Sequence, residues 1–344
     1  MNKYDELYLF RRAKLNDTDR VMRFIREYWK ENHILGNDRD FFLYEHGDKD
    51  EVNFIICENK GDGDLVGIHG FIPYSWAEEL RHVCGVMTMV KKDTLPMLGV
   101  ELIKRFIEIT EYQTYCGIGT NPKTMVPLVK RIFKRYVGKM EHYYRLNEKI
   151  DEFTIASIAN RKKSDLENQE GKQAGLLEFE NFDEVKRRFV LNMPYKFLPY
   201  KEDWYIEKRY FNHPIYHYRV FGIVVNGRVG SLLIGRQVEH ANKRIIRFVD
   251  FIGDIAELPL VNQAIRGIIE SNGYEYADFL LHGAPEDIMN KAGFVRKTED
   301  EGNIIPNYFE PFVQSNVTIW CEKSHEDMII FRADADADRP SMRY

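Results

Sequence analysis

The stretch Val83-Cys-Gly-Val-Met-Thr-Met-Val-Lys-Lys92 opens the part of the sequence that decides the fold. It predicts a strand, and residues 96–111 (PMLGVELIKRFIEITE) follow as a helix. A second strand (115–120, YCGIGT), a second helix (122–136) and a third strand (138–147) complete the stretch. Strands that alternate with helices in this way predict an α/β fold built on a mixed sheet.

The two predicted helices differ in the faces that they bury. The helix 96–111 is apolar nearly all round, which predicts burial against a sheet. The helix 122–136 is amphipathic, because its apolar residues follow the spacing of one helical face: Met125, Leu128, Val129, Ile132, Phe133 and Tyr136. Pro96 and Pro122 each suit a first helical position, where the missing N–H would have no partner anyway.

The elements upstream extend this unit toward the N-terminus. Leu7–Ala13 predicts a first strand, and Asp17 is a plausible N-cap for a helix after it. Two more strands are predicted at Val52–Asn59 and Leu65–Ser75, with a hairpin connection at residues 60–64. The first half therefore has the order strand, helix, three strands, helix, strand, helix, strand.

The second half repeats much of this order. Asn226-Gly227 predicts a tight hairpin turn between two strands. The elements expected there are strands at 218–225, 228–236, 244–252 and 276–282, and helices at 259–271 and 285–292.

A spacing of 163 residues separates Pro96 from Pro259 and Pro122 from Pro285, and each pair opens an equivalent predicted helix. This spacing predicts a duplicated α/β unit. The polar segment 160–172 (NRKKSDLENQEGK) lies between the copies. We therefore predict two domains, residues 1–160 and 161–344.

The element order of the first half resembles the core of the GNAT acyltransferase superfamily. The run GVELIK from Gly99 and the run Gly117-Ile-Gly-Thr-Asn121 are also similar to that family. Its loop after the fourth strand usually reads Q/R-x-x-G-x-G/A, whereas residues 94–99 here (TLPMLG) keep only the last glycine. The resemblance implies two tandem GNAT-like domains packed together.

The resemblance further implies acyl-coenzyme A as a co-substrate, with no permanently bound cofactor. In the family, the pyrophosphate of coenzyme A binds at the loop before this helix, where unpaired N–H groups and the helix dipole attract anions. The pantetheine arm lies between the fourth and fifth strands. The residues implied to contact coenzyme A are Thr88, Met89, Val90, Met97, Leu98, Gly99, Gly117 and Asn121.

The equivalent loop of the second half carries two acids, Asp254 and Glu257. Carboxylates at that position oppose the binding of a pyrophosphate. We therefore expect acyl-coenzyme A on residues 1–160, and we expect residues 161–344 to complete the pocket of the acceptor.

Two residues are candidates for the group that takes a proton from the acceptor amine. His33 lies in a loop that forms the acceptor side in related enzymes, although a capping or surface histidine explains it equally simply. Asp250 lies on the strand where many GNAT enzymes keep a glutamate base, although it can instead pair with Arg247. His46 and His282 are candidates for contacts with the acceptor.

The segment 331–340 (FRADADADRP) places acidic residues at every second position. An extended chain would present Asp334, Asp336 and Asp338 on one side, ready for hydroxyls or an amine, and Arg339 follows them. A solvated, fraying terminus is the alternative. The spacing does not fit an EF-hand, whose sixth position is glycine, and no other metal site is predicted.

Charge and composition limit the classes of partner that the protein can bind. A net charge of −5 and a pI near 6.1 argue against a nucleic-acid binder. No apolar run approaches membrane-spanning length, and the N-terminus lacks an apolar signal core, so we expect a cytoplasmic protein without membrane contact. The cysteines are Cys57, Cys84, Cys116 and Cys321, and their wide spacing predicts reduced, buried thiols.

Within the superfamily, the sequence resembles tandem-domain nucleotide-sugar N-acyltransferases. The resemblance implies transfer of an acyl group, for example 3-hydroxybutanoyl, from acyl-coenzyme A to the amine of a dTDP-linked amino-deoxyhexose for O-antigen or capsule assembly. Two alternatives stay open: an aminoacyl-tRNA-dependent transferase of the same fold, and a binding module without catalysis. The sequence does not predict an oligomeric state.

Overall fold

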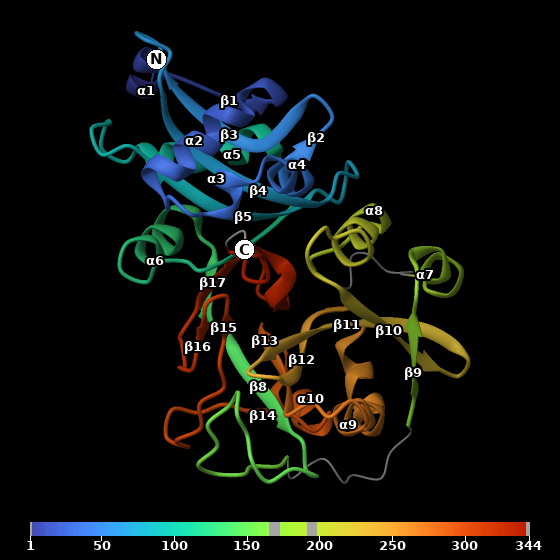
Figure 1. Cartoon of the computed structure of the whole chain (residues 1–344). Helices are drawn as coiled ribbons and strands as arrows, with labels where there is room; N and C mark the ends of the chain where they lie inside the picture. The colour runs from blue at the N-terminus through green and yellow to red at the C-terminus, as the bar shows by residue number, and fades with distance from the viewer. Residues whose placement is uncertain (1, 165–172, 191–197, 342–344) are drawn as a thin grey trace.

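The computed structural model describes residues 2–164, 173–190 and 198–341. Residues 165–172 of the predicted connecting segment lie outside these ranges. The described chain forms two mixed eight-stranded sheets, one above the other in Figure 1, with helices on their faces. The prediction of a mixed α/β fold is confirmed.

The first sheet has the strand order β1-β3-β4-β5-β6-β17-β7, and β2 pairs with β3. Among its described strands, β5 and β6 are parallel and the other neighbours are antiparallel. Its strands are β1 (Tyr8–Lys14), β2 (Gly47–Asp48), β3 (Glu51–Asn59), β4 (Leu65–Ser75), β5 (His82–Val90), β6 (Thr114–Ile118), β7 (Tyr136–Lys139) and β17 (Trp320–Lys323).

The second sheet has the order β14-β8-β13-β12-β11-β10-β9, and β18 pairs with β13. Here β12 and β13 are the parallel pair. Its strands are β8 (Glu141–Leu146), β9 (Gly175–Phe179), β10 (Tyr218–Val225), β11 (Arg228–His240), β12 (Lys243–Ile252), β13 (Tyr276–His282), β14 (Val295–Arg296) and β18 (Ile330–Phe331). A separate hairpin joins β15 (Tyr308–Phe309) to β16 (Phe312–Val313).

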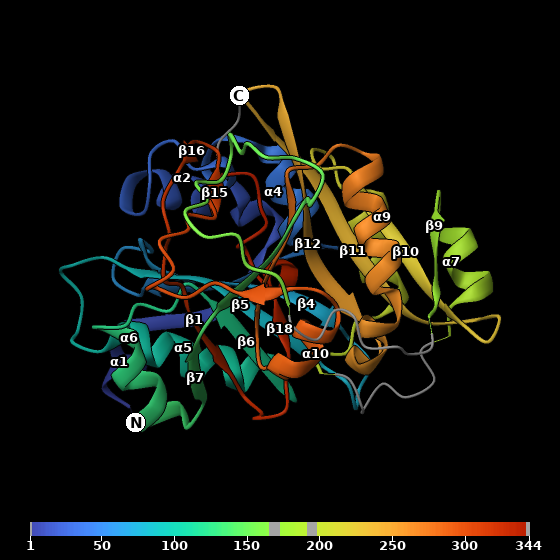
Figure 2. The same ribbon diagram turned by 90° about the horizontal axis from the view of Figure 1, so that it is seen from below.

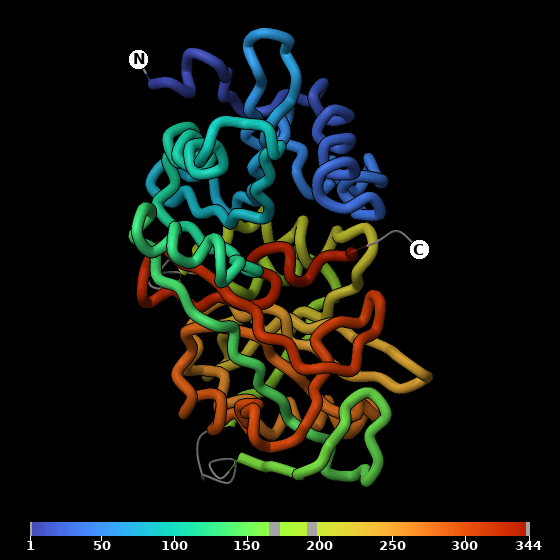
Figure 3. The backbone as a smooth tube through the Cα atoms, turned by 90° about the vertical axis from the view of Figure 1, so that its left-hand side faces the viewer, coloured from blue at the N-terminus to red at the C-terminus, as the bar shows by residue number. Residues whose placement is uncertain are grey.

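The two sheets exchange strands. β8 follows β7 directly in the chain but lies in the second sheet, whereas β17 returns to the first sheet between β6 and β7. In Figure 3 the green chain can be followed from the upper body into the lower one. The prediction of one strand over 138–147 is wrong, because the chain leaves the first sheet at Met140, which packs in a core shared by both sheets. Strands from both sides of residue 160 thus pair with each other. The predicted division into two domains at this residue stays a prediction.

Helices cover the faces of both sheets, as the view from below shows (Figure 2). The helix predicted at 96–111 is α5, and the helix predicted at 122–136 is shorter, with α6 continuing as a π-helical turn over Val129–Phe133. None of the described helices is both long and apolar enough to cross a lipid bilayer. The α-helices are α1 (Lys3–Leu7), α2 (Thr18–Tyr28), α3 (Ile34–Asn37), α4 (Arg39–His46), α5 (Leu98–Thr110), α6 (Met125–Leu128), α7 (Phe182–Arg188), α8 (Asp203–Ile206), α9 (Asn262–Ser271) and α10 (Glu286–Lys291).

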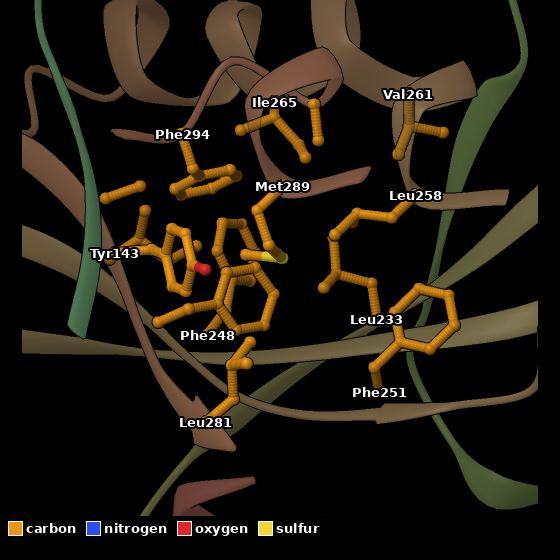
Figure 4. Packing of buried hydrophobic residues seen from close by; sticks show 14 of the residues in the cluster. Tyr143, Leu233, Phe248, Phe251, Leu258, Val261, Ile265, Leu281, Met289 and Phe294 are labelled. Carbon is orange, nitrogen blue, oxygen red and sulfur yellow. The ribbon is translucent and has the colours of Figure 1, made fainter. Parts of the chain in front are cut away.

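The core of the second sheet depends on the exchanged strand. Tyr143 of β8 packs beside Phe248 of β12, and Ile265 of α9 and Met289 of α10 close the cluster (Figure 4). Burying one such side chain stabilises the fold by roughly 1.5–3 kcal/mol. Tyr143 is 1% exposed, so the second core is incomplete without the first half of the sequence.

The cysteines behave as predicted. Each of the four is a buried free thiol on a strand of the first sheet. Cys84 and Cys116 lie opposite each other in the parallel pair β5–β6, and burial raises the pKa of both thiols. They act as small apolar side chains.

Candidate active site

The parallel strands of the first sheet pair only at their beginnings. β5 pairs with β6 between residues 82–85 and 114–117, and β5 then continues to Val90 while β6 ends at Ile118. No other described strand enters the space beyond the last pair. We call this space, between residues 86–90 and the end of β6, the first fork.

The base of the first fork is closed by an aromatic ring. A Cβ at Gly85 would collide with the Tyr115 hydroxyl, so glycine is what allows this ring to lie across the two strands. The guanidinium of Arg135 stacks 3.5 Å from the centre of the Tyr115 ring and pairs with Glu322 of β17 at 2.9 Å. These contacts fix the point at which the strands diverge.

The turn after β5 leaves two backbone donors without an acceptor. Met97 has a left-handed φ of 66°, and among the described residues the N–H groups of Met97 and Gly99 find no hydrogen-bond acceptor. A Cβ at Gly99 would meet only Val90, at 3.9 Å, so the turn is not plugged by side chains. The Tyr4 hydroxyl holds the turn by donating to the Pro96 carbonyl at 2.7 Å. Free N–H groups at a helix N-terminus attract anions, so this turn can receive a phosphate.

The residues expected to bind the pantetheine arm lie on the unpaired part of β5. Thr88, Met89 and Val90 are all partly exposed there. The Thr88 hydroxyl lies 2.8 Å from Nδ1 of His69 on β4. Burial, and to a smaller extent Arg135, lower the pKa of His69 to about 3, so this imidazole is neutral at pH 7.

The remaining residues expected at coenzyme A divide between the core and the surface. Leu98 begins α5 and is buried in the core. Gly117 is the last residue of β6 that pairs with β5. Asn121 is exposed, and its side-chain oxygen accepts hydrogen bonds from the N–H groups of Lys123 and Thr124. Their predicted role at coenzyme A stays a prediction.

The parallel strands of the second sheet also diverge, but the chain fills the space between them. β12 pairs with β13 over residues 246–248 and 277–279, and β12 then runs on to Ile252. β18 enters this second fork, where Phe331 pairs with Leu281 and Ile330 with His282. A strand of the protein thus occupies the position that a pantetheine arm would need.

A buried charge cluster seals the second fork. Lys201 Nζ lies 2.5 Å from the Asp250 carboxylate and 2.6 Å from that of Asp334. Both aspartates are fully buried, and Asp250 also accepts hydrogen bonds from the Tyr210 hydroxyl and the Phe251 N–H. Burial and the charge of Asp250 raise the pKa of Asp334 to about 6, against the opposing effect of Lys201. These contacts give Asp250 and Asp334 a structural task.

The helical turn after β12 already holds an anion of the chain. The Asp254 carboxylate caps the three-ten helix Ile255–Val261 by accepting from the Ala256 N–H at 3.1 Å. This turn corresponds to Met97–Gly99 in the first half. An internal carboxylate there leaves no favourable place for a phosphate.

Asp338 is the most firmly bound acid of the tail. Its carboxylate accepts from Arg236 at 2.9 Å and from the Tyr218 hydroxyl at 2.8 Å, and it has no exposed surface. Although burial acts in the opposite direction, Arg236 and Arg209 lower its pKa to about 2. Asp338 is therefore a permanently ionised anchor of the tail.

Asp336 and Arg339 tie the tail to α4 of the first half. Arg339 pairs with Glu45 through Nη1 and with Asp336 through Nη2, each at 2.9 Å. Asp336 keeps a partly exposed carboxylate, whose pKa is raised by burial. Two residues predicted to bind substrate thus meet beside the first sheet.

The three predicted histidines have structural contacts. Nδ1 of His33 accepts from the Leu35 N–H at 3.2 Å and caps α3, and burial, followed by Arg339, lowers its pKa to about 3. His46 is fully buried beside Phe42 and Phe54. The His282 ring occupies the space that a Cβ at Gly138 would need. A histidine with a pKa near 3 is a weak base at neutral pH, so His33 suits capping better than proton transfer.

A cavity of about 240 Å³ lies between the two halves, at the end of β6. We call it the central pocket, and the tail that forms one of its walls is the red chain between the two bodies in Figure 3. The lining residues that matter are Gly119, Arg247, Asn307, Arg332, Asp336 and Arg339. The central pocket therefore joins the end of the first fork to charged groups of the second half.

Sequence reasoning missed several residues of these sites. Lys201 pairs with the predicted residue Asp250, and Glu45 pairs with the predicted residue Arg339. Both lie in stretches of sequence without a distinctive motif. Arg332 adjoins the acidic tail in the sequence, but nothing local marks it as a pocket residue. Among the described residues, no group of histidine, cysteine or acidic side chains could hold a metal ion.

Solved structures share this architecture, although no protein-family model and no curated protein matches the sequence. A conserved protein of unknown function from Enterococcus faecalis V583, described as a probable N-acyltransferase, matches with a TM-score of 0.52 and 8% identity, over 93% of this chain and 73% of that one. The chain shares the fold of that protein, with two mixed eight-stranded sheets. The predicted mixed α/β fold is confirmed, and membership of the GNAT superfamily stays a prediction.

Further structures match at lower scores. A GCN5-related N-acetyltransferase from Anabaena variabilis ATCC 29413 has a TM-score of 0.49 and 10% identity, over 91% of this chain and 72% of that one. Saccharomyces cerevisiae N-myristoyltransferase with bound myristoyl-CoA and inhibitors has a TM-score of 0.43 and 9% identity, over 94% of this chain and 83% of that one. At such identities a likeness shows the fold alone.

Proposed function

We propose that the protein is an acyl-coenzyme A-dependent N-acyltransferase whose cofactor site is the first fork. The observation that carries this proposal is the contrast between a first fork that no described strand enters and a second fork filled by β18. The fold supports it, because that architecture is shared with a protein described as a probable N-acyltransferase.

The residues of the first fork fit the parts of coenzyme A. The free N–H groups of Met97 and Gly99 suit the diphosphate, and the unpaired edge of residues 86–90 suits the amide-bearing pantetheine arm. Lys92 precedes the turn and adds positive charge, whereas Lys91 is paired with Asp64 at 2.5 Å. The acyl group would then end near Gly119, where the central pocket begins.

The central pocket is the proposed acceptor site. The acceptor amine attacks the thioester carbonyl, a C–N bond forms, the C–S bond breaks, and the amine proton leaves through the pocket while the thiolate departs. The protein contributes by holding amine and thioester in line. Asp336 and Glu310 are partly exposed carboxylates of this pocket, and we assign to Asp336 the binding of the amine.

For the substrates, we propose an amino-deoxyhexose linked to a nucleotide as acceptor and a short acyl chain such as 3-hydroxybutanoyl as donor group, within surface polysaccharide assembly in the cytoplasm. The resemblance in sequence to nucleotide-sugar N-acyltransferases supports this finer proposal. The charged lining of the central pocket is compatible with such a polar acceptor.

Replacement of Met97 tests the cofactor site. Met97→Asp places a carboxylate where the diphosphate would bind, as Asp254 does in the second half, and should weaken binding of coenzyme A at least ~10-fold. Asparagine has the shape of aspartate without its charge, so the Met97→Asn variant should bind coenzyme A nearly as the natural protein does. Binding is measured by calorimetry, and release of free thiol from acyl-coenzyme A with an amino-sugar acceptor reports activity. Equal binding by both variants, or no binding of coenzyme A to the natural protein, would overturn the proposal.

A further inference from the structure

The central pocket contains a buried positive charge that the chain does not neutralise. Arg332 is 2% exposed, lines the pocket, and has no carboxylate within ion-pair distance among the described residues. Only Nη2 has a hydrogen-bond acceptor, the side-chain oxygen of Asn307. Nε is buried without any partner. A buried guanidinium with unused donors is costly, and proteins normally pair such a group.

The neighbouring charges are already matched to one another. Arg247 forms an ion pair with Asp278 at 2.8 Å, and Arg236 forms one with Asp338 at 2.9 Å. His142 also contacts Asp278, and its pKa is lowered by burial, so it adds no charge at neutral pH. The two nearest carboxylates, Asp278 and Asp338, are thus each paired with another arginine, and Arg332 forms no ion pair of its own among the described residues.

Arg332 stays charged in this setting. Burial and the nearby Arg247 lower its pKa from 12.5 to about 9, which still leaves the guanidinium protonated at pH 7. The other acids of the pocket have partners of their own: Asp336 pairs with Arg339, and Glu310 accepts from the Tyr216 hydroxyl. The unmatched cation therefore faces the cavity, which is large enough for a small molecule.

We propose that the central pocket binds an oxyanion group of the acceptor, a phosphate or a carboxylate, against Arg332 and Asn307. This inference rests on the proposed function for the identity of the acceptor, but the anion site itself follows from the buried, unpaired guanidinium of Arg332 beside the cavity. Arg332 binds and positions the acceptor, while Asp336, in the same pocket, offers a negative charge to the amine. The preferred acceptor thus carries both an amine and an oxyanion.

The first test replaces Asn307 by aspartate. The Asn307 side-chain oxygen already accepts from Arg332, so Asn307→Asp supplies the missing negative charge with almost no change of shape. It should weaken oxyanion binding at least ~10-fold and raise the melting temperature without ligand by roughly 2 °C or more, because the buried cation gains a partner. The matched control is Asn181→Asp at the exposed N-cap of α7, outside the pocket, which should leave oxyanion binding unchanged.

The measurement is calorimetric titration of the full chain with inorganic phosphate, inorganic pyrophosphate or acetate at constant ionic strength, with coenzyme A present at saturation to occupy the first fork. Binding of phosphate or pyrophosphate alone indicates a phosphorylated acceptor, and binding of acetate indicates a carboxylated one. Arg332→Met is the second variant, and it should lose oxyanion binding without lowering the melting temperature. If Arg332 served only to stabilise the fold, its replacement would lower the melting temperature.

The outcomes separate this inference from the proposed function. Absence of oxyanion binding to the natural protein, or equal binding by Asn307→Asp, overturns the anion site even if coenzyme A binds. Oxyanion binding that depends on Asn307 in a protein that ignores coenzyme A supports the anion site and overturns the acyl-transfer proposal.

Discussion

The two forks begin alike and end differently. Each is formed by a parallel pair of strands that diverges after a few residues, and each is followed by a helical turn. In the first fork the turn has free N–H groups at Met97 and Gly99, whereas Asp254 caps the turn of the second. The second fork is also filled by β18. A strand of the chain thus fills the second fork, whereas no described strand enters the first.

The filling of the second fork has a consequence for the first. The segment that starts at β18 continues through Asp334, whose backbone carbonyl accepts from the Tyr74 hydroxyl and the Cys116 thiol of the first sheet. It then forms a wall of the central pocket through Asp336 and Arg339. The segment that fills the second fork thus also contributes a wall of the central pocket, next to the end of β6 in the first sheet.

The largest effect is expected from breaking the charge cluster of the second fork. Lys201→Met leaves two buried carboxylates without their cation and should lower the free energy of unfolding by about 3–5 kcal/mol. Lys149→Met is the control, because its pair with Glu270 is exposed and should contribute less than about 1 kcal/mol. Urea unfolding at pH 7.5 measures both. If both variants lost similarly small amounts of unfolding free energy, the charge cluster would not hold the second fork together.

Acid should destabilise the protein through His69 beside the first fork. The unfolded chain protonates this histidine near pH 6.5, but the folded protein resists protonation until about pH 3, so stability is lost as the pH falls below 6.5. Between pH 7.5 and 4.5 the natural protein should lose about 2–3 kcal/mol more than His69→Gln. The exposed His217→Gln variant should lose stability as the natural protein does. Parallel pH curves for all three proteins would contradict the prediction.

Acid should have the opposite effect through Asp334 in the second fork. Its pKa is raised in the folded protein, so the ionised form is disfavoured above pH 6, and this penalty disappears as the pH falls toward 3.8. Asp334→Asn should therefore stabilise the protein by about 1–2 kcal/mol at pH 8, with a gain that shrinks at pH 5. Asp183→Asn, at an exposed site, serves as the control. A gain that does not depend on pH would argue against ionised Asp334.

The smallest effect is expected from the cap of the second turn. Asp254→Ala removes the acceptor for the Ala256 N–H and should cost about 1 kcal/mol. Binding of coenzyme A should not change, because β18 still fills the second fork. Calorimetry with coenzyme A decides this: a clear change of affinity would place the cofactor in the second half rather than the first.

The local elements could be predicted because their signals are local. The apolar stretch after Pro96 predicted the helix that is α5, and Asn226-Gly227 predicted the turn between β10 and β11, where both residues have positive φ. The spacing of prolines predicted a duplicated unit, but Pro259 lies inside a three-ten helix instead of opening α9, so the duplication stays a prediction. Asp254 was predicted to oppose a phosphate at the second turn, and in the structure it caps that turn.

The partners of the charged residues could not be predicted in this way. Asp250 and Asp334 had the residue type of a base or a substrate ligand, but Lys201, distant from both in the sequence, turns them into a buried cluster. His33 had the residue type of a base, but desolvation lowers its pKa to about 3 and its side chain caps α3. Burial and long-range pairing decide such roles, and neither is encoded in a short stretch of sequence.

The sequence alone determined the mixed α/β architecture and the place of the turn at Met97–Gly99, because periodicity, turn residues and helix starts act over a few positions. Only the tertiary structure decided that β8 and β17 change sheets, that β18 fills one fork, and that Arg332 is left without a partner beside a cavity. The physical reason is that pairing between distant segments is chosen by the total burial and charge balance of the folded chain.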